Sequence, residues 1–368
     1  MGGPPPIPRM NVRSIEAGSK YTGRLPTGCV LCRKGAKMVL LITGKCETGC
    51  FYCPLSVKKK GRETTYADER KVRNDEDILS EARSIDAQGT GMTGGDPITA
   101  LDRTLKYIAL LKSTFGDKHH IHLYTSSIRL DAYRRLEMAG LDELRIHPPI
   151  HLWNKLEQTN LREASARSGM NMGMEIPAIP NCREDLVAVI DYADTIGMDF
   201  VNINELEFSE TNWRRLRSRG FDVKNEISSA VKGSQELAVN MLNLNLSIPI
   251  HYCSSSFKDS IQLRRRIMRR ARNVARHSDV ITEDGTFLKG VIETRNSCKV
   301  IDTLLNEFQV PKKLVHFDLE KRRVEVAPWV LEEIAGNLPY DSYLVEEYPT
   351  ADRLEVEREQ LGSKTKRH

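Results

Sequence analysis

Short apolar runs alternate with amphipathic stretches between about residue 38 and residue 255. Residues 38–42 form a continuous apolar run, which is typical of a parallel strand covered on both faces. Amphipathic helices are predicted between the strands, for example at residues 101–111 and 131–139. Repeated strand–helix units predict an α/β fold with a parallel sheet and right-handed crossovers. The further strands are predicted at residues 88–97 (with a turn), 120–125, 143–147, 173–179 and 200–204, with an additional one at 246–252.

Polar residues gather where the predicted strands end. When repeated strand–helix units close into a barrel, the active-site residues lie at the C-terminal ends of the strands. Glu175 stands inside an otherwise apolar strand, where an unpaired carboxylate is costly, and this favours a role in a site. His147 fits either a site residue or a histidine whose hydrogen bonds are satisfied. The candidate site residues are Thr125, Ser126, His147, Glu175, Asn204, Glu205, Glu207, His251 and Cys253.

Pattern changes divide the chain into predicted parts. After residue 280 the pattern indicates a hairpin at residues 284–285, and later a helix at residues 329–335. This small α+β region is expected to cover the barrel mouth or hold a substrate. The predicted parts are an N-terminal extension with a cysteine pair (1–37), the barrel (38–255), a basic helix (256–280), the α+β region (281–360) and a disordered tail (361–368).

Composition narrows the class of protein. Of the 368 residues, 40% are apolar and 29% are charged, so the chain can bury one barrel-sized core and a smaller piece. No apolar run approaches the roughly 18 residues of a membrane-spanning helix. The first residues lack the apolar core of a signal peptide. Eight cysteines in such a chain favour reduced thiols over disulfides, so a cytoplasmic protein is expected.

Positive charge is concentrated in one helical stretch. Between Lys258 and Arg276 there are eight basic residues and one acid, while the whole chain has a net charge of +5. The arginines from Arg264 to Arg276 form either a solubilising face or a surface for RNA or another phosphate-bearing partner. The apolar residues expected to face the protein recur at helical spacing and are Leu263, Ile267, Ala271 and Val274.

The most specific motif is a group of three cysteines in one short loop. Cys46, Cys50 and Cys53 follow the first predicted strand with the spacing C-x3-C-x2-C, and Tyr52 adds a ring beside the last. A structural zinc site usually closes with four ligands, often as two C-x2-C pairs. A bacterial ferredoxin run has four cysteines with different gaps. Three thiolates suit a cubane iron–sulfur cluster with one open iron, and ordinary or zinc-binding cysteines are the alternative.

A second motif follows about forty residues later, at Gly94-Gly95-Asp96-Pro97. Paired glycines let a backbone come close to a ligand, and Pro97 fixes the direction of the chain. The two motifs together resemble the radical S-adenosylmethionine (SAM) superfamily, in which the second strand carries Gly-Gly-Glu-Pro. Here Asp96 stands where the family has Glu. Residues 50–55 and 139–147 are most similar to the archaeal pyruvate formate-lyase activating-enzyme-like branch.

The resemblance, over about residues 29–255, implies a partial (β/α)6 radical SAM barrel with an extra strand and a small C-terminal α+β appendage. It implies a 4Fe–4S cluster held by the three cysteines, with SAM on the fourth iron. The reduced cluster cleaves SAM to methionine and a 5′-deoxyadenosyl radical, which abstracts hydrogen from an unidentified substrate. An external donor of ferredoxin or flavodoxin type supplies the electron. The residues implied to hold SAM are Gly94, Gly95, Asp96, Glu175 and Asn204.

Other cysteines suggest a second site. Cys29 and Cys32 form a C-x2-C pair before the first strand, and Cys253 ends the last strand two residues after His251. Neither group closes a metal site alone, but together they are expected to hold a second metal, as an auxiliary iron–sulfur cluster or as zinc. The remaining cysteines, Cys182 and Cys298, are expected to be plain thiols.

Three functional hypotheses follow from these motifs. The first is a radical SAM enzyme, an iron–sulfur oxidoreductase of activating-enzyme type, that acts on a protein, a cofactor precursor or a lipid. The second is an RNA-modifying radical SAM enzyme. The third is a non-enzymatic metalloprotein whose cysteines hold zinc. A brown protein with absorbance near 400 nm that a reductant bleaches separates the first two hypotheses from the third.

Overall fold

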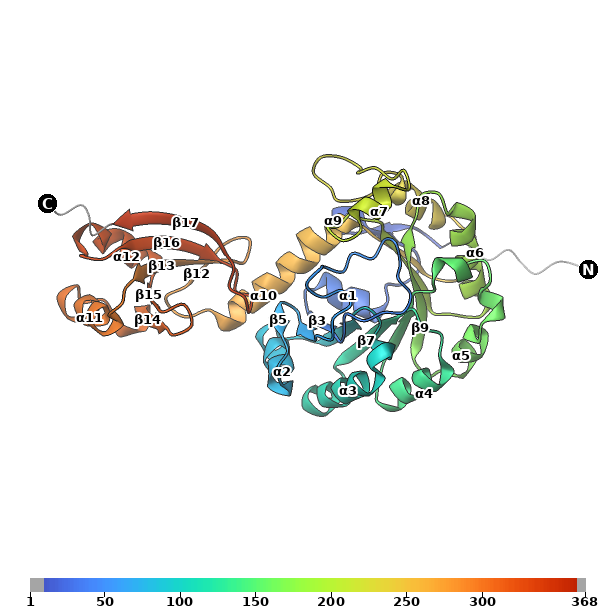
Figure 1. The fold of residues 1–368 in the computed structure, drawn as a ribbon, viewed down its shortest axis with the longest axis horizontal. Helices are drawn as coiled ribbons and strands as arrows, with labels where there is room; N and C mark the ends of the chain where they lie inside the picture. The colour runs from blue at the N-terminus through green and yellow to red at the C-terminus, as the bar shows by residue number, and fades with distance from the viewer. Residues whose placement is uncertain (1–9, 363–368) are drawn as a thin grey trace, which may run out of the picture. The chain divides into compact units, whose positions relative to one another are not determined.

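The computed structural model describes residues 10–362, which form two compact units. The first unit extends to residue 83 and continues over residues 87–263. The second contains residues 84–86 and the chain from residue 264 onward. Figure 1 shows the chain coloured from its N-terminus to its C-terminus.

A curved parallel sheet forms the frame of the first unit. Among the described residues, seven strands follow one another in parallel pairs, and the first does not neighbour the last. The sheet is therefore an open barrel, which confirms the predicted partial (β/α)6 barrel with an additional strand. In spatial order the strands are β3 (Lys37–Leu41), β6 (Gly89–Thr93), β7 (His120–Thr125), β8 (Glu143–Ile146), β9 (Asn171–Ala178), β10 (Phe200–Glu205) and β11 (Ile250–Cys253).

Short antiparallel strands extend both edges of this sheet. β4 and β5 lie beyond β3, and β2 and β1 lie beyond β11. The last parallel strand begins at residue 250, later than predicted, because Pro249 has no N–H for the ladder. The edge strands are β4 (Tyr66–Ala67), β5 (Arg70–Lys71), β2 (Lys20–Tyr21) and β1 (Arg13–Ser14).

Helices cover the outside of the barrel, and one helix lies within it (Figure 1). The inner helix is α1 (Thr27–Arg33). A Cβ at Gly28 would lie 2.7 Å from the side chains of His122 and Arg145, so only glycine lets α1 pack this closely. None of the helices in the described part of the chain has both the length and the apolar character that crossing a bilayer needs. The outer helices are α2 (Asp75–Ser84), α3 (Leu101–Phe115), α4 (Leu130–Met138), α5 (Leu161–Arg167), α6 (Arg183–Thr195) and α8 (Ser234–Met241).

The cysteine loop, residues 42–65 between β3 and β4, contains turns but no helix or strand. The glycine motif that follows β6 forms hydrogen bonds with the first part of the cysteine loop. The N–H of Gly95 donates to the carbonyl oxygen of Thr43 at 2.7 Å, and the N–H of Asp96 donates to that of Lys45 at 2.8 Å. A Cβ would lie 2.4 Å from the Thr43 oxygen if placed on Gly94, and 2.1 Å from the Lys45 oxygen if placed on Gly95. The paired glycines therefore let two backbones meet just before Cys46.

Replacing Gly95 with alanine is expected to displace the cysteine loop, because the clash is with backbone and no flexible side chain can yield. We expect a cost of about 1–3 kcal/mol in the free energy of unfolding. Iron bound after anaerobic reconstitution should fall below half of the wild-type amount. The matched control is Gly336→Ala, because no atom lies within 4 Å of a Cβ at that position. Equal iron binding by the two variants would contradict the role given to Gly95.

The second unit is built on an antiparallel sheet. The β12–β13 hairpin turns at Gly285, with φ +86°, where the sequence predicts a hairpin. The predicted helix at residues 329–335 is α12 (Pro328–Ile334), which packs with α11 (Ser297–Asp302) on one face of the sheet. The strand order is β14 (Val315–Asp318), β15 (Arg323–Val326), β13 (Phe287–Glu293), β16 (Ser342–Glu347) and β17 (Glu355–Gly362), with β12 (Val280–Ile281) beside β13.

Two predictions about this part of the chain are wrong in detail. Leu361 and Gly362, expected in the disordered tail, belong to β17, and residues 363–368 lie outside the described residues. The basic stretch forms a π-helical turn, residues 258–263, followed by α10 (Arg264–Val274). Ile267 and Ala271 are buried as predicted, but Leu263 and Val274 are 36% and 38% exposed, because Arg266 and Arg270 complete the buried stripe.

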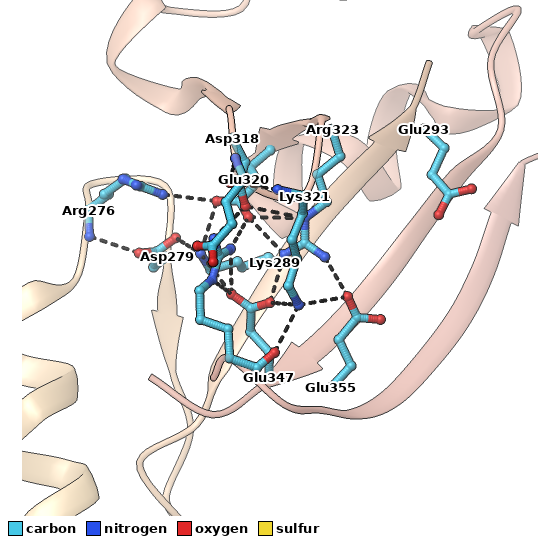
Figure 2. Close-up of polar contacts among 12 residues, drawn as sticks. Arg276, Asp279, Lys289, Glu293, Asp318, Glu320, Lys321, Arg323, Glu347 and Glu355 are labelled. Atoms are coloured by element: carbon cyan, nitrogen blue, oxygen red, sulfur yellow. Dashed lines mark hydrogen bonds and ion pairs between the residues drawn. The ribbon is translucent and has the colours of Figure 1, made fainter. Parts of the chain in front are cut away.

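The two faces of the second sheet differ in chemistry. Alternation along β15 points Val324 and Val326 into an apolar cluster, and Arg323 and Glu325 to the other face. On that face the charged side chains are paired with one another (Figure 2). We call this set the ionic network. Its five basic and five acidic members are Arg276, Lys289, Lys321, Arg323, Arg353, Asp279, Asp318, Glu325, Glu347 and Glu355.

Lys289 lies at the centre of the ionic network (Figure 2). Its Nζ lies 2.9 Å from Glu325, 3.3 Å from Glu347 and 3.5 Å from Asp279, and its side chain is 4% exposed. Burial alone would raise the pKa of Glu347, but Lys289, Arg323 and Arg353 together lower that pKa to about 2. Glu347 is therefore ionised, and removing one cation leaves buried charge without a partner.

A Lys289→Met variant is expected to lose about 3–5 kcal/mol in the free energy of unfolding of the second unit. Urea unfolding of the full chain, followed by hydrogen exchange of β13 and β16, measures this loss. The control is Lys299→Met in α11, because that lysine is exposed. The network is not a stabilising element if the two variants unfold at the same urea concentration.

Candidate functional site

A cavity of about 530 Å³ opens at the C-terminal ends of the barrel strands. The cysteine loop forms one wall of this cavity, and the strand ends form another. The structure thus brings the two sequence motifs together with all nine predicted strand-end residues. Those nine lining residues are Thr125, Ser126, His147, Glu175, Asn204, Glu205, Glu207, His251 and Cys253.

All three cysteines of the motif line the cavity. Cys46 is exposed, whereas Cys50 and Cys53 are half-buried. The N–H of Thr48 donates to the Cys46 sulfur at 3.4 Å, and Gly49 turns the loop with φ +63°, a conformation that favours glycine. Burial raises the pKa of the Cys50 thiol.

The spacing of these donors bears on which group they hold. Within residues 10–362, no three His, Cys, Asp or Glu side chains lie close enough to bind one metal ion. A cubane cluster separates its thiolate ligands more widely than a single ion does, since each thiolate binds a different iron. Three thiols that line one cavity are a donor set that fits a 4Fe–4S cluster with one iron left without a cysteine.

Side chains at the start of α7 (Trp213–Arg217) and just before it donate hydrogen bonds to backbone carbonyl groups of the cysteine loop. The Asn212 amide donates to the Tyr52 carbonyl at 2.9 Å, and the Thr211 hydroxyl donates to the Cys53 carbonyl at 3.2 Å. Arg215 donates to the Cys50 carbonyl at 3.3 Å. The sequence analysis missed these three residues, because a polar pair before a short helix has the same pattern as an ordinary helix start.

Tyr52 is fixed by a histidine on the barrel. Its hydroxyl lies 2.8 Å from His147 Nε2, and His147 Nδ1 lies 2.7 Å from the carbonyl oxygen of Glu175. Burial lowers the pKa of His147, so the ring is neutral and donates through Nδ1. It then accepts from Tyr52 through Nε2. His147 thus both lines the cavity and has its hydrogen bonds satisfied.

Asp96 is buried and fully engaged by protein donors. Its Oδ1 accepts from the Thr125 hydroxyl at 2.8 Å, and its Oδ2 accepts from the Ser126 and Ser127 hydroxyls at 2.8 and 2.9 Å. Gly94 and Gly95 line the cavity, but Asp96 is not among its lining residues. The Ser126 hydroxyl also lies 2.6 Å from that of Thr48, so Asp96 connects β7 to the cysteine loop.

Glu175 is the centre of a buried polar group inside the barrel. Its carboxylate accepts from Arg145 at 3.0 Å, from Asn202 at 2.8 Å and from Asn204 at 2.6 Å. Burial raises the pKa of Glu175, but the Arg145 charge and the two amides outweigh burial and hold the pKa below its ordinary value. The sequence analysis named Glu175 and Asn204 and missed Arg145. The charged alternation Glu143-Leu144-Arg145 within a strand was the available signal.

The other cysteine pair and Cys253 line the same cavity. The Cys29 sulfur lies 3.2 Å from the Asn202 amide and 3.4 Å from Arg145. Burial raises the pKa of all three thiols, Cys29, Cys32 and Cys253.

His251 stands beside these thiols on the cavity wall. Its Nδ1 lies 2.9 Å from the Asn202 Oδ1. Its Nε2 is buried and has no hydrogen-bond partner among the residues described. Burial lowers the pKa of His251 to about 4, so the ring is neutral. A neutral ring held through Nδ1 leaves the Nε2 lone pair available to a ligand.

Sequence comparison gives two family matches and, among the related proteins, one that aligns over nearly the whole chain. Residues 40–204 match the radical SAM superfamily, and residues 285–361 match a domain of unknown function (DUF8061). A protein of Methanocaldococcus jannaschii, provisionally named a glycyl-radical enzyme activating enzyme, is 37% identical over 377 residues. The alignment covers 96% of this chain and 98% of that protein.

Structure comparison gives weaker likenesses. The crystal structure of methylornithine synthase (PylB) aligns with a TM-score of 0.39 and 12% identity, over 57% of this chain and 64% of that one. HydG, a maturase of the FeFe-hydrogenase, aligns with a TM-score of 0.38 and 10% identity, over 58% and 52%. These likenesses carry no functional argument. The relative that spans nearly the whole chain, together with the family match over the barrel, shows that the chain belongs to the radical SAM superfamily, whose cofactors are a 4Fe–4S cluster and S-adenosylmethionine.

Proposed function

We propose that this chain is a radical SAM activating enzyme that removes a hydrogen atom from a partner protein. The observation that carries the proposal is that Cys46, Cys50 and Cys53 share one cavity with the main chain of Gly94 and Gly95. When bound, the cluster supplies one electron to SAM, whose C–S bond breaks to give methionine and the 5′-deoxyadenosyl radical. The protein's share of the chemistry is to orient these groups and to exclude water from them.

The residues around the cavity have distinct proposed roles. Gly94 and Gly95 offer main-chain groups to the methionine end of SAM. Asp96 is proposed to affect SAM binding only indirectly, because its carboxylate accepts hydrogen bonds from the Thr125 and Ser126 hydroxyls. The Ser126 hydroxyl in turn contacts Thr48 of the cysteine loop. Asn204 donates its amide N–H to Glu175 and keeps its Oδ1 for a ribose hydroxyl of SAM.

The two acids at the end of β10 are proposed to shape the cavity and not to accept protons. Glu205 pairs with Lys224 at 3.2 Å and also accepts from Ser255, and Glu207 pairs with Lys258 at 3.1 Å. Each carboxylate thus has a cation beside it.

A protein substrate is proposed from the long relative, whose name assigns it to enzymes that activate glycyl-radical enzymes. By analogy, the hydrogen atom would come from a main-chain glycine of the partner protein. The exposed Cys46 supports this proposal, because the wall of the cavity then reaches the surface where a large substrate docks.

An RNA substrate is the alternative, and the arginines of α10 weigh against it. Arg270 is buried and donates to the Pro349 carbonyl, and Arg276 pairs with Glu325 at 3.0 Å. Arg264 pairs with Asp284 at 3.3 Å. These contacts support a structural use of the charge. Faster SAM cleavage on addition of RNA would favour the alternative.

Cys50→Ala is expected to abolish 5′-deoxyadenosine production under dithionite, because two thiolates do not retain the cluster. Anaerobic turnover with SAM, followed by chromatography of the nucleoside, measures the loss. The matched control is Cys298→Ala, since Cys298 is exposed in α11 and distant in sequence from both motifs. Undiminished production by Cys50→Ala would refute the proposed function.

We also propose that Cys29, Cys32 and Cys253 hold an auxiliary iron–sulfur cluster. Three thiols that line one cavity, together with a neutral His251 whose buried Nε2 has no hydrogen-bond partner in the described residues, supply a suitable donor set. Asn202 and Arg145 stand beside the Cys29 sulfur, as hydrogen-bond donors to a thiolate ligand do.

Iron counting tests this second site. Anaerobically reconstituted wild-type protein is expected to hold about eight irons per chain, two cubanes of four. The double variant Cys29→Ala/Cys32→Ala should hold about four and keep the spectrum of the first cluster. About four irons in the wild type, with no zinc, would remove the second site and leave the first intact.

A further inference from the structure

Basic side chains are concentrated in two segments: residues 45–62, which belong to the cysteine loop, and residues 210–219, which contact it. We call the surface of these two segments the basic rim. The two segments contain nine basic side chains and two acidic ones, Glu47 and Glu210. The whole chain has 55 basic and 50 acidic residues, so the positive charge of the rim is a local feature.

The second segment contacts the cysteine loop directly, and the first is part of the loop. Arg215 donates to the Cys50 carbonyl at 3.3 Å, and the Arg219 guanidinium lies 4.3 Å from the centre of the Phe51 ring. On the other side, the Gly44 N–H donates to the Arg62 carbonyl at 2.8 Å. The charge of the rim is therefore attached to the residues that flank the three cysteines.

The α7 side of the rim reaches the cysteines from outside the cavity. Cys50 and Cys53 line the cavity, but none of residues 211–219 does. A molecule that binds over α7 thus approaches the backbone of the cysteines without entering the space for SAM. This is the geometry required of a reductant, which must be near the cluster while SAM occupies the open iron.

Part of the rim is available to a partner. Lys58 and Arg214 are exposed and form no ion pair within residues 10–362. Trp213, which precedes Arg214 in the sequence, is 46% exposed, and its ring centroid lies 4.7 Å from that of Phe208. An exposed aromatic ring beside charged side chains suits the limited interfaces of electron-transfer complexes.

We infer that the basic rim is the docking surface for a small acidic one-electron carrier protein of flavodoxin or ferredoxin type. The carrier loses one electron and the 4Fe–4S cluster gains it, and no atom is transferred. Opposite charges steer such encounters and raise their rates at low salt. The inference rests on the proposed function, since only a cluster that is reduced for turnover needs the carrier.

The test compares a protein reductant with a chemical one. The variant is Lys58→Glu/Arg214→Glu, and the control is Arg134→Glu/Lys118→Glu, which makes the same charge change at exposed residues in α4 and after α3. 5′-Deoxyadenosine production is driven either by flavodoxin with its NADPH-dependent reductase or by dithionite. Binding of oxidised flavodoxin is measured separately by surface plasmon resonance at low and high salt.

The rim variant is expected to lose about tenfold or more in the flavodoxin-driven rate and in flavodoxin affinity. Its dithionite-driven rate should stay within about twofold of wild type, and wild-type affinity should fall with salt. Equal losses with both reductants, or a flavodoxin response equal to that of the control, would overturn the inference. Rim-dependent binding of RNA with unchanged flavodoxin binding would overturn it too. Absence of product with dithionite in the wild type would instead reject the proposed function, while the binding measurement would still test the surface.

Discussion

The backbone contact between the glycine motif and the start of the cysteine loop is the constraint on which the site depends. The loop between β3 and β4 has no helix or strand of its own, so its shape must come from outside. On one side, Gly94 and Gly95 fix the shape of the loop, because the absence of side chains lets their backbone form hydrogen bonds with the loop backbone. Thr211, Asn212 and Arg215 fix it on the other side through three loop carbonyls.

This arrangement gives the family's glycine motif a second purpose in this chain. The paired glycines are usually considered for their approach to a ligand, but here they also approach protein backbone. Asp96 continues the same pattern, because its carboxylate binds Thr125, Ser126 and Ser127. Its shorter side chain, compared with Glu, suits these close contacts. The motif therefore fixes the start of the cysteine loop, in addition to its proposed main-chain approach to SAM.

Charge is used in the two units for different physical purposes. In the second unit, five cations and five carboxylates neutralise one another on the buried face of a sheet. Such a network adds little to stability over an apolar face, but it makes each member costly to remove. In the first unit, the basic rim leaves Lys58 and Arg214 exposed and without an ion pair within residues 10–362. The paired charges of the ionic network thus constrain one another within the fold, whereas exposed Lys58 and Arg214 are available to a partner.

Periodicity and motif spacing predicted most of the barrel and the candidate site. The strand at residues 120–125 was predicted at its observed bounds, and the nine strand-end residues all line the cavity. Strand ends are predictable because parallel strands present them at one edge.

The site and core residues that the sequence did not predict depend mainly on contacts between distant parts of the chain. Asn212 acts through long-range contacts, to the carbonyls of Tyr52 and Glu207, that no local pattern marks. For Arg145 the charged alternation with Glu143 was a signal, but its contact with Glu175, 30 residues away, could not be read from it. The burial of Arg266 and Arg270, where Leu263 and Val274 were expected, likewise depends on what packs against the helix.

The central claim is that three cysteines hold a cluster whose fourth iron binds SAM. Electron paramagnetic resonance of the anaerobically reconstituted protein, reduced with dithionite, tests it most directly. The account predicts the signal of a reduced 4Fe–4S cluster in the wild-type protein, with g-values that change when SAM is added. A signal that SAM leaves unaltered, or a protein that takes up zinc and gives no iron signal, would contradict the account.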